Sequence, residues 1–151
     1  MLFNIVLYQP EIPANTGNIG RLCVGTNSTL HIIKPMKFML TDKYLKRAAL
    51  DYWDKLNLRF YEDWNDFLNK ITDKRLFLFT TKSKKNYTKI SFQKYDFLIF
   101  GPETRGLPQD ILTSNWKNAF TIPMSNKIRS INLSNSVAIV LYEAIRQTGF
   151  C

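Results

Sequence analysis

Three polar segments of this chain carry the side chains that could bind a ligand or take part in a reaction. The first, PEIPANTGNIGR, runs from Pro10 to Arg21, and Asn15 or Thr16 in it could cap the start of a helix. Arg21 stands about one turn into that helix, where a guanidinium and the free N–H groups of the helix start favour an anion. An ordinary capped helix with a surface arginine is the alternative.

The second segment, FGPETRGLP, spans Phe100–Pro108 and follows an apolar run that reads as a strand. Its glycines and proline preset a turn, which leaves Glu103 and Arg105 as polar groups on a fixed backbone. Ligands of open α/β sheets bind where strands end, so the position favours a binding role over a turn closed by a Glu103–Arg105 pair. The sequence contains neither GxGxxG nor GxxxxGK[ST], which removes the main support for dinucleotide and P-loop sites.

The third segment, IPMSNKIRSINLSN, spans Ile122–Asn135 and leads into a long helical pattern. One Ser or Asn side chain suffices to cap a helix, and this segment has more than capping requires. The surplus favours ligand contacts, with an irregular polar loop as the alternative. The residues concerned are Ser125, Asn126, Ser130, Asn132, Ser134 and Asn135.

The elements that must position these segments alternate between short apolar runs and helix-length segments. This alternation predicts one α/β domain over residues 1–151, with a parallel sheet flanked by helices. The expected strands are Leu2–Tyr8, Thr29–Ile33, Arg75–Thr80, Asp96–Phe100 and Asn118–Ile122. The expected helices are Thr16–Thr26, Asp42–Leu50, Asp63–Ile71, a short helix after Pro108, and Leu133–Thr148, which should end at Gly149.

Two further stretches have more than one interpretation. The helix Leu133–Thr148 is apolar on more than one side, which is typical of a helix that also meets a second subunit. The aromatic-rich stretch Asp51–Asp66 is expected to pack in the core rather than to stack on bases.

The charge of the chain favours a polyanionic partner. Lys and Arg number 21 against 12 Asp and Glu, a net charge of +9, which suits RNA, DNA or an anionic membrane without choosing among them. The linker Lys82–Lys89, KSKKNYTK, is either a solvated loop or a contact for an RNA backbone, with Tyr87 as its single stacking surface.

Neither a membrane span nor a metal site is expected. No apolar run approaches the ~20 residues of a span, and the start of the chain has no signal-peptide pattern, so the expectation is a soluble cytoplasmic protein. Two cysteines, Cys23 and Cys151, and the single His31 do not make a zinc site. Cys23 is expected to be a buried helix residue and His31 a structural strand residue.

Taken in order, the three polar segments resemble the three motifs of the SPOUT methyltransferases over the whole chain. The opening NIVLYQPEIPANTGNIGRLC and the phrases TTK, FGPETRGLP and NLSN are similar to those of the bacterial tRNA (cytidine/uridine) 2′-O-methyltransferases that act on the anticodon wobble nucleotide. The resemblance implies a SPOUT-type fold with a C-terminal trefoil knot and S-adenosylmethionine as methyl donor. It also implies tRNA as substrate and a homodimer in which each active site borrows from the partner.

The resemblance further implies roles for individual residues. Because a guanidinium stays protonated, Arg21 is expected to hold a phosphate and to stabilise developing alkoxide charge, while Glu103 or water takes the proton. The implied cofactor contacts are Phe79, Thr80, Gly101, Glu103, Ile122, Met124, Ser130 and Leu133. The implied catalytic set is Arg21, Asn15, Glu103, Ser130 and Asn132. A 2′-O-methyltransferase of another tRNA or rRNA site, and a non-catalytic RNA-binding protein of the same fold, remain as alternatives.

Overall fold

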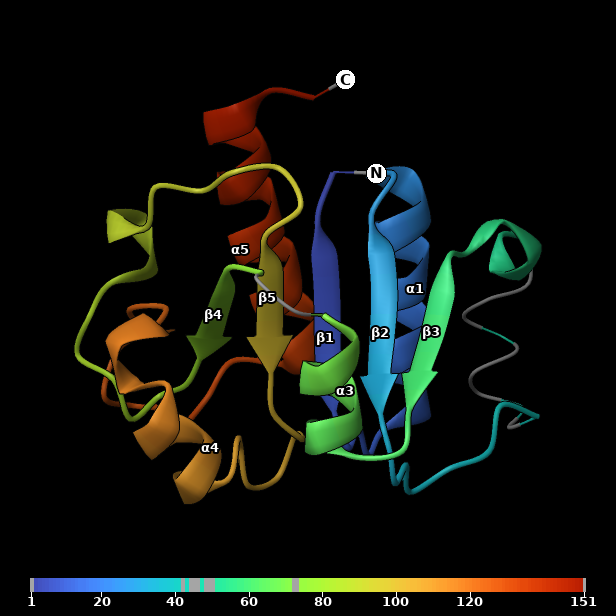
Figure 1. Ribbon diagram of the computed structural model, residues 1–151, viewed down its shortest axis with the longest axis horizontal. Helices are drawn as coiled ribbons and strands as arrows, with labels where there is room; N and C mark the ends of the chain where they lie inside the picture. The colour runs from blue at the N-terminus through green and yellow to red at the C-terminus, as the bar shows by residue number, and fades with distance from the viewer. Residues whose placement is uncertain (1, 42, 44–46, 48–50, 72–73, 151) are drawn as a thin grey trace.

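A single parallel sheet forms the centre of the molecule (Figure 1). The computed structural model describes residues 2–41, 43, 47, 51–71 and 74–150. The sheet has the order β3-β2-β1-β5-β4-β6. The strands are β1 (Asn4–Tyr8), β2 (Thr29–Ile33), β3 (Leu58–Tyr61), β4 (Leu76–Phe79), β5 (Phe97–Phe100) and β6 (Ala119–Phe120). Because neighbouring strands are parallel, their carboxyl ends all lie at one edge of the sheet, at the bottom of Figure 1.

Helices cover both faces of this sheet. In Figure 1, α3 and α4 lie in front of the sheet and α1 and α5 lie behind it. The helices are α1 (Pro13–Gly25), α3 (Trp64–Lys70), α4 (Gln109–Ser114) and α5 (Leu133–Thr148). Three short 3-10 turns lie in the connections that lead to strands β3, β5 and β6, namely η1 (Trp53–Lys55), η2 (Tyr87–Lys89) and η3 (Trp116–Asn118). Every residue of β2 and of β5 is buried, as expected for strands covered on both faces.

The core consists of two clusters, one on each face. The cluster behind the sheet joins the strands to α1 and α5, which pack against each other, and α5 contributes Val137, Val140, Leu141 and Ala144 with no exposed surface. The cluster in front joins the strands to α3 and α4 through residues such as Phe67 and Leu112. Burying one such aliphatic side chain stabilises the fold by about 1.5–3 kcal/mol. In the described part of the chain, no helix is long and apolar enough to cross a membrane.

The predicted parallel α/β sheet is confirmed, and so is the long final helix, which ends at Gly149 in the left-handed region (φ 83°). One strand was missed. β3 lies inside the aromatic stretch Asp51–Asp66, where only core packing was predicted, and it pairs with β2 at the sheet edge. The predicted helix Asp42–Leu50 falls on residues that lie largely outside the described part of the chain.

His31 and Cys23 are structural residues, as predicted. Asn4 Oδ1 lies 3.0 Å from His31 Nε2 and can only accept, so Nε2 carries the proton and Nδ1 accepts from the Tyr61 hydroxyl at 2.8 Å. Burial, with a smaller contribution from the charge of Arg59, lowers the pKa of His31 to about 3, so the ring is neutral. Burial also raises the pKa of the Cys23 thiol in α1, which makes a nucleophilic thiolate unfavourable.

Candidate active site

A cavity of about 420 Å³ opens at the carboxyl edge of the sheet, where the three polar segments meet. Its wall is built from the start of α1, the ends of β4 and β5 with the segments that follow them, and the segment between β6 and α5. The volume lies in the range of small-molecule sites, which is about 300–1,000 Å³. Segments that are about 90 residues apart in the sequence thus form one site.

The structure brings together most of the residues that the sequence singled out. All eight residues expected to contact a cofactor line the cavity, namely Phe79, Thr80, Gly101, Glu103, Ile122, Met124, Ser130 and Leu133. Of the expected catalytic residues, Asn15, Glu103, Ser130 and Asn132 line it too, and Arg21 does not.

The turn after β5 depends on two glycines. A Cβ atom at Gly101 would lie 2.2 Å from the Leu107 backbone nitrogen, so the chain folds back on itself at a distance that only glycine permits. Gly106 adopts a φ of +69°, the left-handed region, and its N–H donates to the Pro102 carbonyl at 2.9 Å. The segment FGPETRGLP is therefore a rigid turn that holds Glu103 in one place.

Glu103 caps α1 from this distant turn. Its Oε2 accepts from the Glu11 N–H at 2.8 Å, and its Oε1 accepts from the Ile12 N–H at 3.1 Å and from Asn15 Nδ2 at 3.3 Å. The prediction that Asn15 or Thr16 caps the helix is wrong. The helix begins at Pro13, the N-cap residue Ile12 has no capping side chain, and a carboxylate at the helix start satisfies free N–H groups and suits the helix dipole.

Asn15 connects this carboxylate to the third segment. The Asn15 Oδ1 accepts from Asn132 Nδ2 at 3.1 Å, while Asn132 Oδ1 accepts from the Ser134 and Asn135 N–H groups at the start of α5. The chain Glu103–Asn15–Asn132 therefore joins the three segments through side chains alone. Part of the Ser and Asn surplus thus serves to cap α5 through Asn132. The hydroxyls of Ser134 and Ser136 also donate to Asn132.

A second set of contacts fastens the first two segments to each other. Arg105 Nη2 donates to Gln9 Oε1 at 2.8 Å, so the Glu103–Arg105 pair considered from the sequence does not form. Thr104 Oγ1 donates to Glu11 Oε1 at 2.8 Å. Hydrogen bonds from Lys37 and then from Thr104 lower the pKa of Glu11, which keeps it charged. Gln9, Glu11 and Thr104 could not be singled out from the sequence, because their partners are remote in the chain.

Arg21 lies on α1 away from the cavity of its own chain. It follows Asn15 by six residues, which is ~9 Å along a helix axis, and its side chain is exposed. Beside it, the Tyr52 hydroxyl donates to the Gly17 carbonyl, and Tyr52 and Trp53 pack over Gly20. Within one chain, the guanidinium is therefore held on the surface and not at the site.

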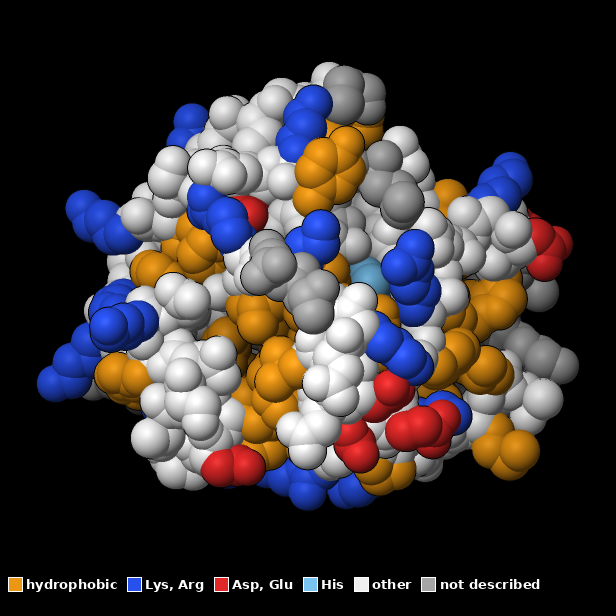
Figure 2. All heavy atoms as spheres, viewed as in Figure 1, with side chains coloured by type: hydrophobic (Ala, Val, Ile, Leu, Met, Phe, Trp, Pro, Cys, Tyr) orange, Lys and Arg blue, Asp and Glu red, His pale blue; other side chains and the backbone are white. Residues whose placement is uncertain are grey.

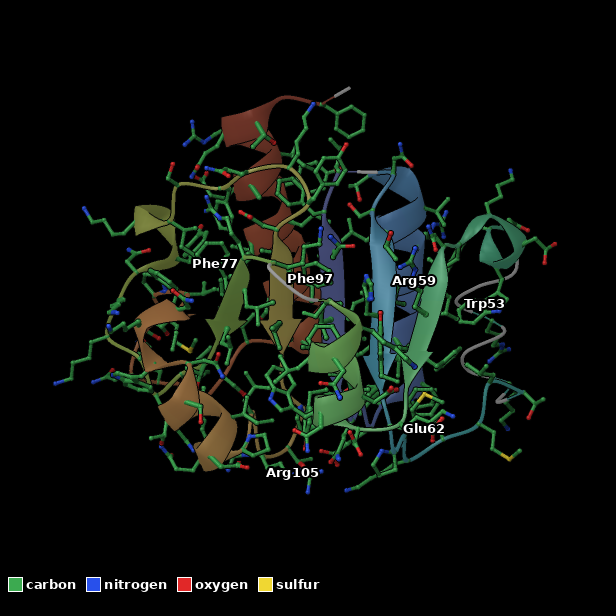
Figure 3. All side chains as sticks on the ribbon, viewed as in Figure 1. Trp53, Arg59, Glu62, Phe77, Phe97 and Arg105 are labelled. Carbon is green, nitrogen blue, oxygen red and sulfur yellow. The ribbon has the colours of Figure 1, made fainter. Side chains whose placement is uncertain are left out.

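The cavity wall carries more positive than negative charge. Lys82, Arg105 and Arg129 line it, and Glu103 is its one carboxylate in the described part of the chain. Arg105 lies at the carboxyl edge, at the bottom of Figure 3. Among the residues that the structure describes, no group of three or more His, Cys, Asp or Glu side chains could hold a metal ion.

The chain is similar to known proteins over nearly its whole length. The family model described as the SpoU rRNA Methylase family matches residues 2–142. The chain is 48% identical to a tRNA (cytidine(34)-2′-O)-methyltransferase of Methylovorus glucosotrophus, covering 99% of this chain and 97% of that one. It is 49% identical to the protein of the same description from Escherichia coli, covering 99% and 96%. A solved structure described as giving insights into the 2-OH methylation of C/U34 on tRNA has a TM-score of 0.92 and 40% identity, covering 96% and 95%.

Proposed function

The chain belongs to the SpoU rRNA methylase family, and on that premise we propose that it methylates the ribose 2′-hydroxyl of the anticodon wobble nucleotide of tRNA, a cytidine or a modified uridine. The observation that carries the proposal is the convergence of three polar segments on one cavity at the carboxyl edge of the sheet. The specific target rests on the relatives, which are nearly half identical to this chain and are matched over 97% and 96% of their own length.

The cavity suits S-adenosylmethionine as the methyl donor. Its size fits a nucleoside-containing cofactor, and the ends of β4 and β5 present backbone N–H and C=O groups that can bind an adenine edge. The close turn at Gly101 brings the backbone of Gly106 and Leu107 against the end of β5 and fixes the shape of this wall. The cofactor supplies an electrophilic methyl carbon. The residues that would hold it are Phe79, Thr80, Gly101, Glu103, Ile122, Met124, Ser130 and Leu133.

The residues of the chain then have to align the acceptor hydroxyl and manage one proton. Ser130 and Asn132 face the cavity and provide hydrogen-bonding groups for the acceptor ribose. Both carboxylate oxygens of Glu103 already accept hydrogen bonds from the start of α1. We therefore assign Glu103 a positioning role and assign the proton to water.

Arg21 completes the site from a second subunit. The guanidinium lies outside the cavity of its own chain, so its role requires a homodimer in which Arg21 of one subunit reaches the cavity of the other. The exposed Ile139 and Tyr142 on α5, the helix that packs against α1, support contact with another subunit there. A permanently charged guanidinium can hold a phosphate and stabilise the developing alkoxide.

The proposal includes the C-terminal trefoil knot and a place in the cell. The sheet order and the return of α5 from the β6 edge to α1 support the knotted SPOUT topology. A tRNA substrate supports the cytoplasm as the compartment.

Methylation of tRNA from a strain that lacks the wobble modification tests the proposal. The protein is incubated with that tRNA and tritiated S-adenosylmethionine, and the product is digested for nucleoside mass spectrometry and position mapping. We expect a 2′-O-methylated pyrimidine at the wobble position. A label at another position would move the target to another RNA site, and cofactor binding without any methylated nucleoside would favour a non-catalytic RNA-binding protein.

A further inference from the structure

The positive charge around the cavity exceeds what the cofactor explains. Lys82, Arg105 and Arg129 line the wall, and the oxygens of Glu103 are engaged by α1. S-adenosylmethionine itself carries a net positive charge, because its sulfonium and ammonium groups outnumber its carboxylate. Cations around a cationic ligand are unfavourable unless an anion is also present, and RNA phosphates are such anions.

The segment that carries Lys82, Lys84 and Lys85 is held in place by hydrogen bonds. The buried Ser83 donates its hydroxyl to the Ala119 carbonyl at 2.7 Å, and the Thr121 N–H donates to the Lys85 carbonyl at 2.7 Å. This segment follows β4, and its first residues line the cavity. The segment is therefore exposed to solvent but ordered, and binding to it costs little ordering entropy.

The lysines of this segment continue onto η3. The ammonium of Lys85 donates to the Lys117 carbonyl at 2.9 Å and lies 5.8 Å from the centroid of the Phe120 ring. Lys84 and Lys117 are exposed. Within the described residues, none of these lysines forms an ion pair with a carboxylate. Their charges remain available to an external anion.

An exposed tryptophan belongs to the same turn, η3, as Lys117. Trp116 directly precedes Lys117 in η3 and is 43% exposed, whereas Trp53 and Trp64 are partly buried against the protein. Thr121, which lines the cavity, follows Trp116 by five residues, at most ~18 Å of extended chain. An aromatic ring among lysines is the arrangement that binds single-stranded nucleic acid, by stacking on a base and attracting the phosphates.

We propose that Lys82, Lys84, Lys85, Trp116 and Lys117 form a lysine–tryptophan platform that binds single-stranded RNA next to the target nucleotide. A base stacks on the Trp116 indole, and the neighbouring phosphates lie against the lysines. On the face seen in Figure 2, Lys and Arg side chains gather along the left margin, where Figure 1 places the segment after β4. The inference rests on the proposed function, because it takes the cavity to be the place where the RNA is methylated.

Binding of an anticodon stem-loop RNA, measured by fluorescence anisotropy at several salt concentrations, tests the platform. We expect Trp116→Ala to weaken binding roughly 5- to 150-fold with an unchanged salt slope, because it removes stacking and no charge. Trp116→Phe should retain most of the affinity. Lys84→Glu should weaken binding and reduce the salt slope by about one, the signature of a lost phosphate contact.

Two variants at the opposite edge of the sheet are matched controls. Tyr95 is 60% exposed just before β5, and Lys74 is exposed just before β4, so both lie at the amino edge. Tyr95→Ala removes an exposed ring, and Lys74→Glu changes the net charge as Lys84→Glu does. Both should bind the RNA within about twofold of the wild type. Calorimetry with S-adenosylmethionine should give unchanged affinity for all five variants, which verifies that each is folded.

The results separate the platform from the proposed function. Wild-type RNA affinity in Trp116→Ala, or equal losses in the two control variants, would overturn the platform whether or not the protein methylates tRNA. A wild-type protein that binds the stem-loop through Trp116 and Lys84 without methylating it would support the platform and contradict the proposed function. Equal binding of duplex RNA would also count against the platform, because stacking requires an unpaired base.

Discussion

Glu103 accepts hydrogen bonds from two backbone N–H groups and one side-chain amide of the segment that begins α1. These donors come from residues about 90 positions earlier in the chain. A carboxylate in this position stabilises the start of a helix and fixes the distance between two walls of the cavity. At the scale of single residues, the site is thus held by a group that was expected to handle a proton.

Replacing Glu103 with Gln tests this positioning role. One acceptor oxygen becomes an NH2 group that faces N–H donors, so we expect a loss of about 1–3 kcal/mol in unfolding free energy, measured by urea denaturation. S-adenosylmethionine affinity should fall as well. The control is Glu62→Gln, which removes one partner of an exposed ion pair with Lys34 and should change little. A Glu103→Gln protein with wild-type stability would contradict the capping role.

Arg21→Ala should abolish methylation while cofactor binding stays intact. The side chain is exposed and outside the cavity, so its removal should leave the fold unchanged. Loss of one hydrogen-bond donor that stabilises developing negative charge typically costs about 10²–10³ in turnover. Single-turnover methylation and calorimetry with S-adenosylmethionine measure the two effects separately. Full activity in Arg21→Ala would remove this residue from the mechanism.

The buried His31 predicts a loss of stability in weak acid. Its folded pKa of about 3 lies below its ordinary value of 6.5, so the unfolded chain binds more protons between these values and stability falls as the pH drops below 6.5. At pH 5 the expected loss is about 2 kcal/mol. It is the only histidine in the chain. Carboxylates with lowered pKa, such as Glu143 at about 2, lose their contribution only at more acidic pH.

Urea unfolding at pH 8 and pH 5 measures this effect. His31→Gln should be less stable than the wild type at pH 8 and should lose less stability between the two pH values, since it has no imidazole to protonate. If the stabilities of the two proteins depend equally on pH, His31 has the same pKa in the folded and unfolded chains and is charged in the folded protein at pH 5.

At the scale of elements, the turn after β5 is the part that tolerates least change. Gly101→Ala places a Cβ 2.2 Å from backbone, so we expect a loss of about 1–3 kcal/mol or more and no measurable binding of S-adenosylmethionine. Gly25→Ala is the matched control, because a Cβ there meets nothing within 4 Å and alanine suits the end of α1. Thermal unfolding and calorimetry compare the two. A Gly101→Ala protein that binds the cofactor normally would show that the turn can open.

The elements were predictable where the pattern is local. Alternating apolar runs and a final helix that ends at a glycine are patterns of neighbouring residues. They predicted the sheet and α5 correctly. β3 was missed because LRFY is a four-residue edge strand within an aromatic stretch. The start of α1 was misplaced because Glu103, the group that caps it, lies in another segment. The cavity-lining residues came from the family resemblance, and their mutual contacts came only from the structure.

At the scale of the whole molecule, the cavity and Arg21 of one chain are separate. A mixture of two inactive proteins tests whether a second copy unites them. Arg21→Ala keeps its cavity, and Ser130→Arg blocks the cavity but keeps Arg21. Co-refolding the two in equal amounts should restore about a quarter of wild-type methylation, because half of the dimers are mixed and each has one complete site. No recovered activity, with mixed dimers verified by mass spectrometry, would place Arg21 at the site of its own chain.

The link from Asn132 to Asn15 spans 117 positions, and that from Glu103 to Glu11 spans 92. During synthesis, the first polar segment therefore leaves the ribosome long before either of its partners exists. A chain that stops before Glu103 lacks the carboxylate that caps α1. A chain that stops before α5 has an open cavity wall. Neither can hold the cofactor. The complete cavity therefore forms only in chains that already include α5.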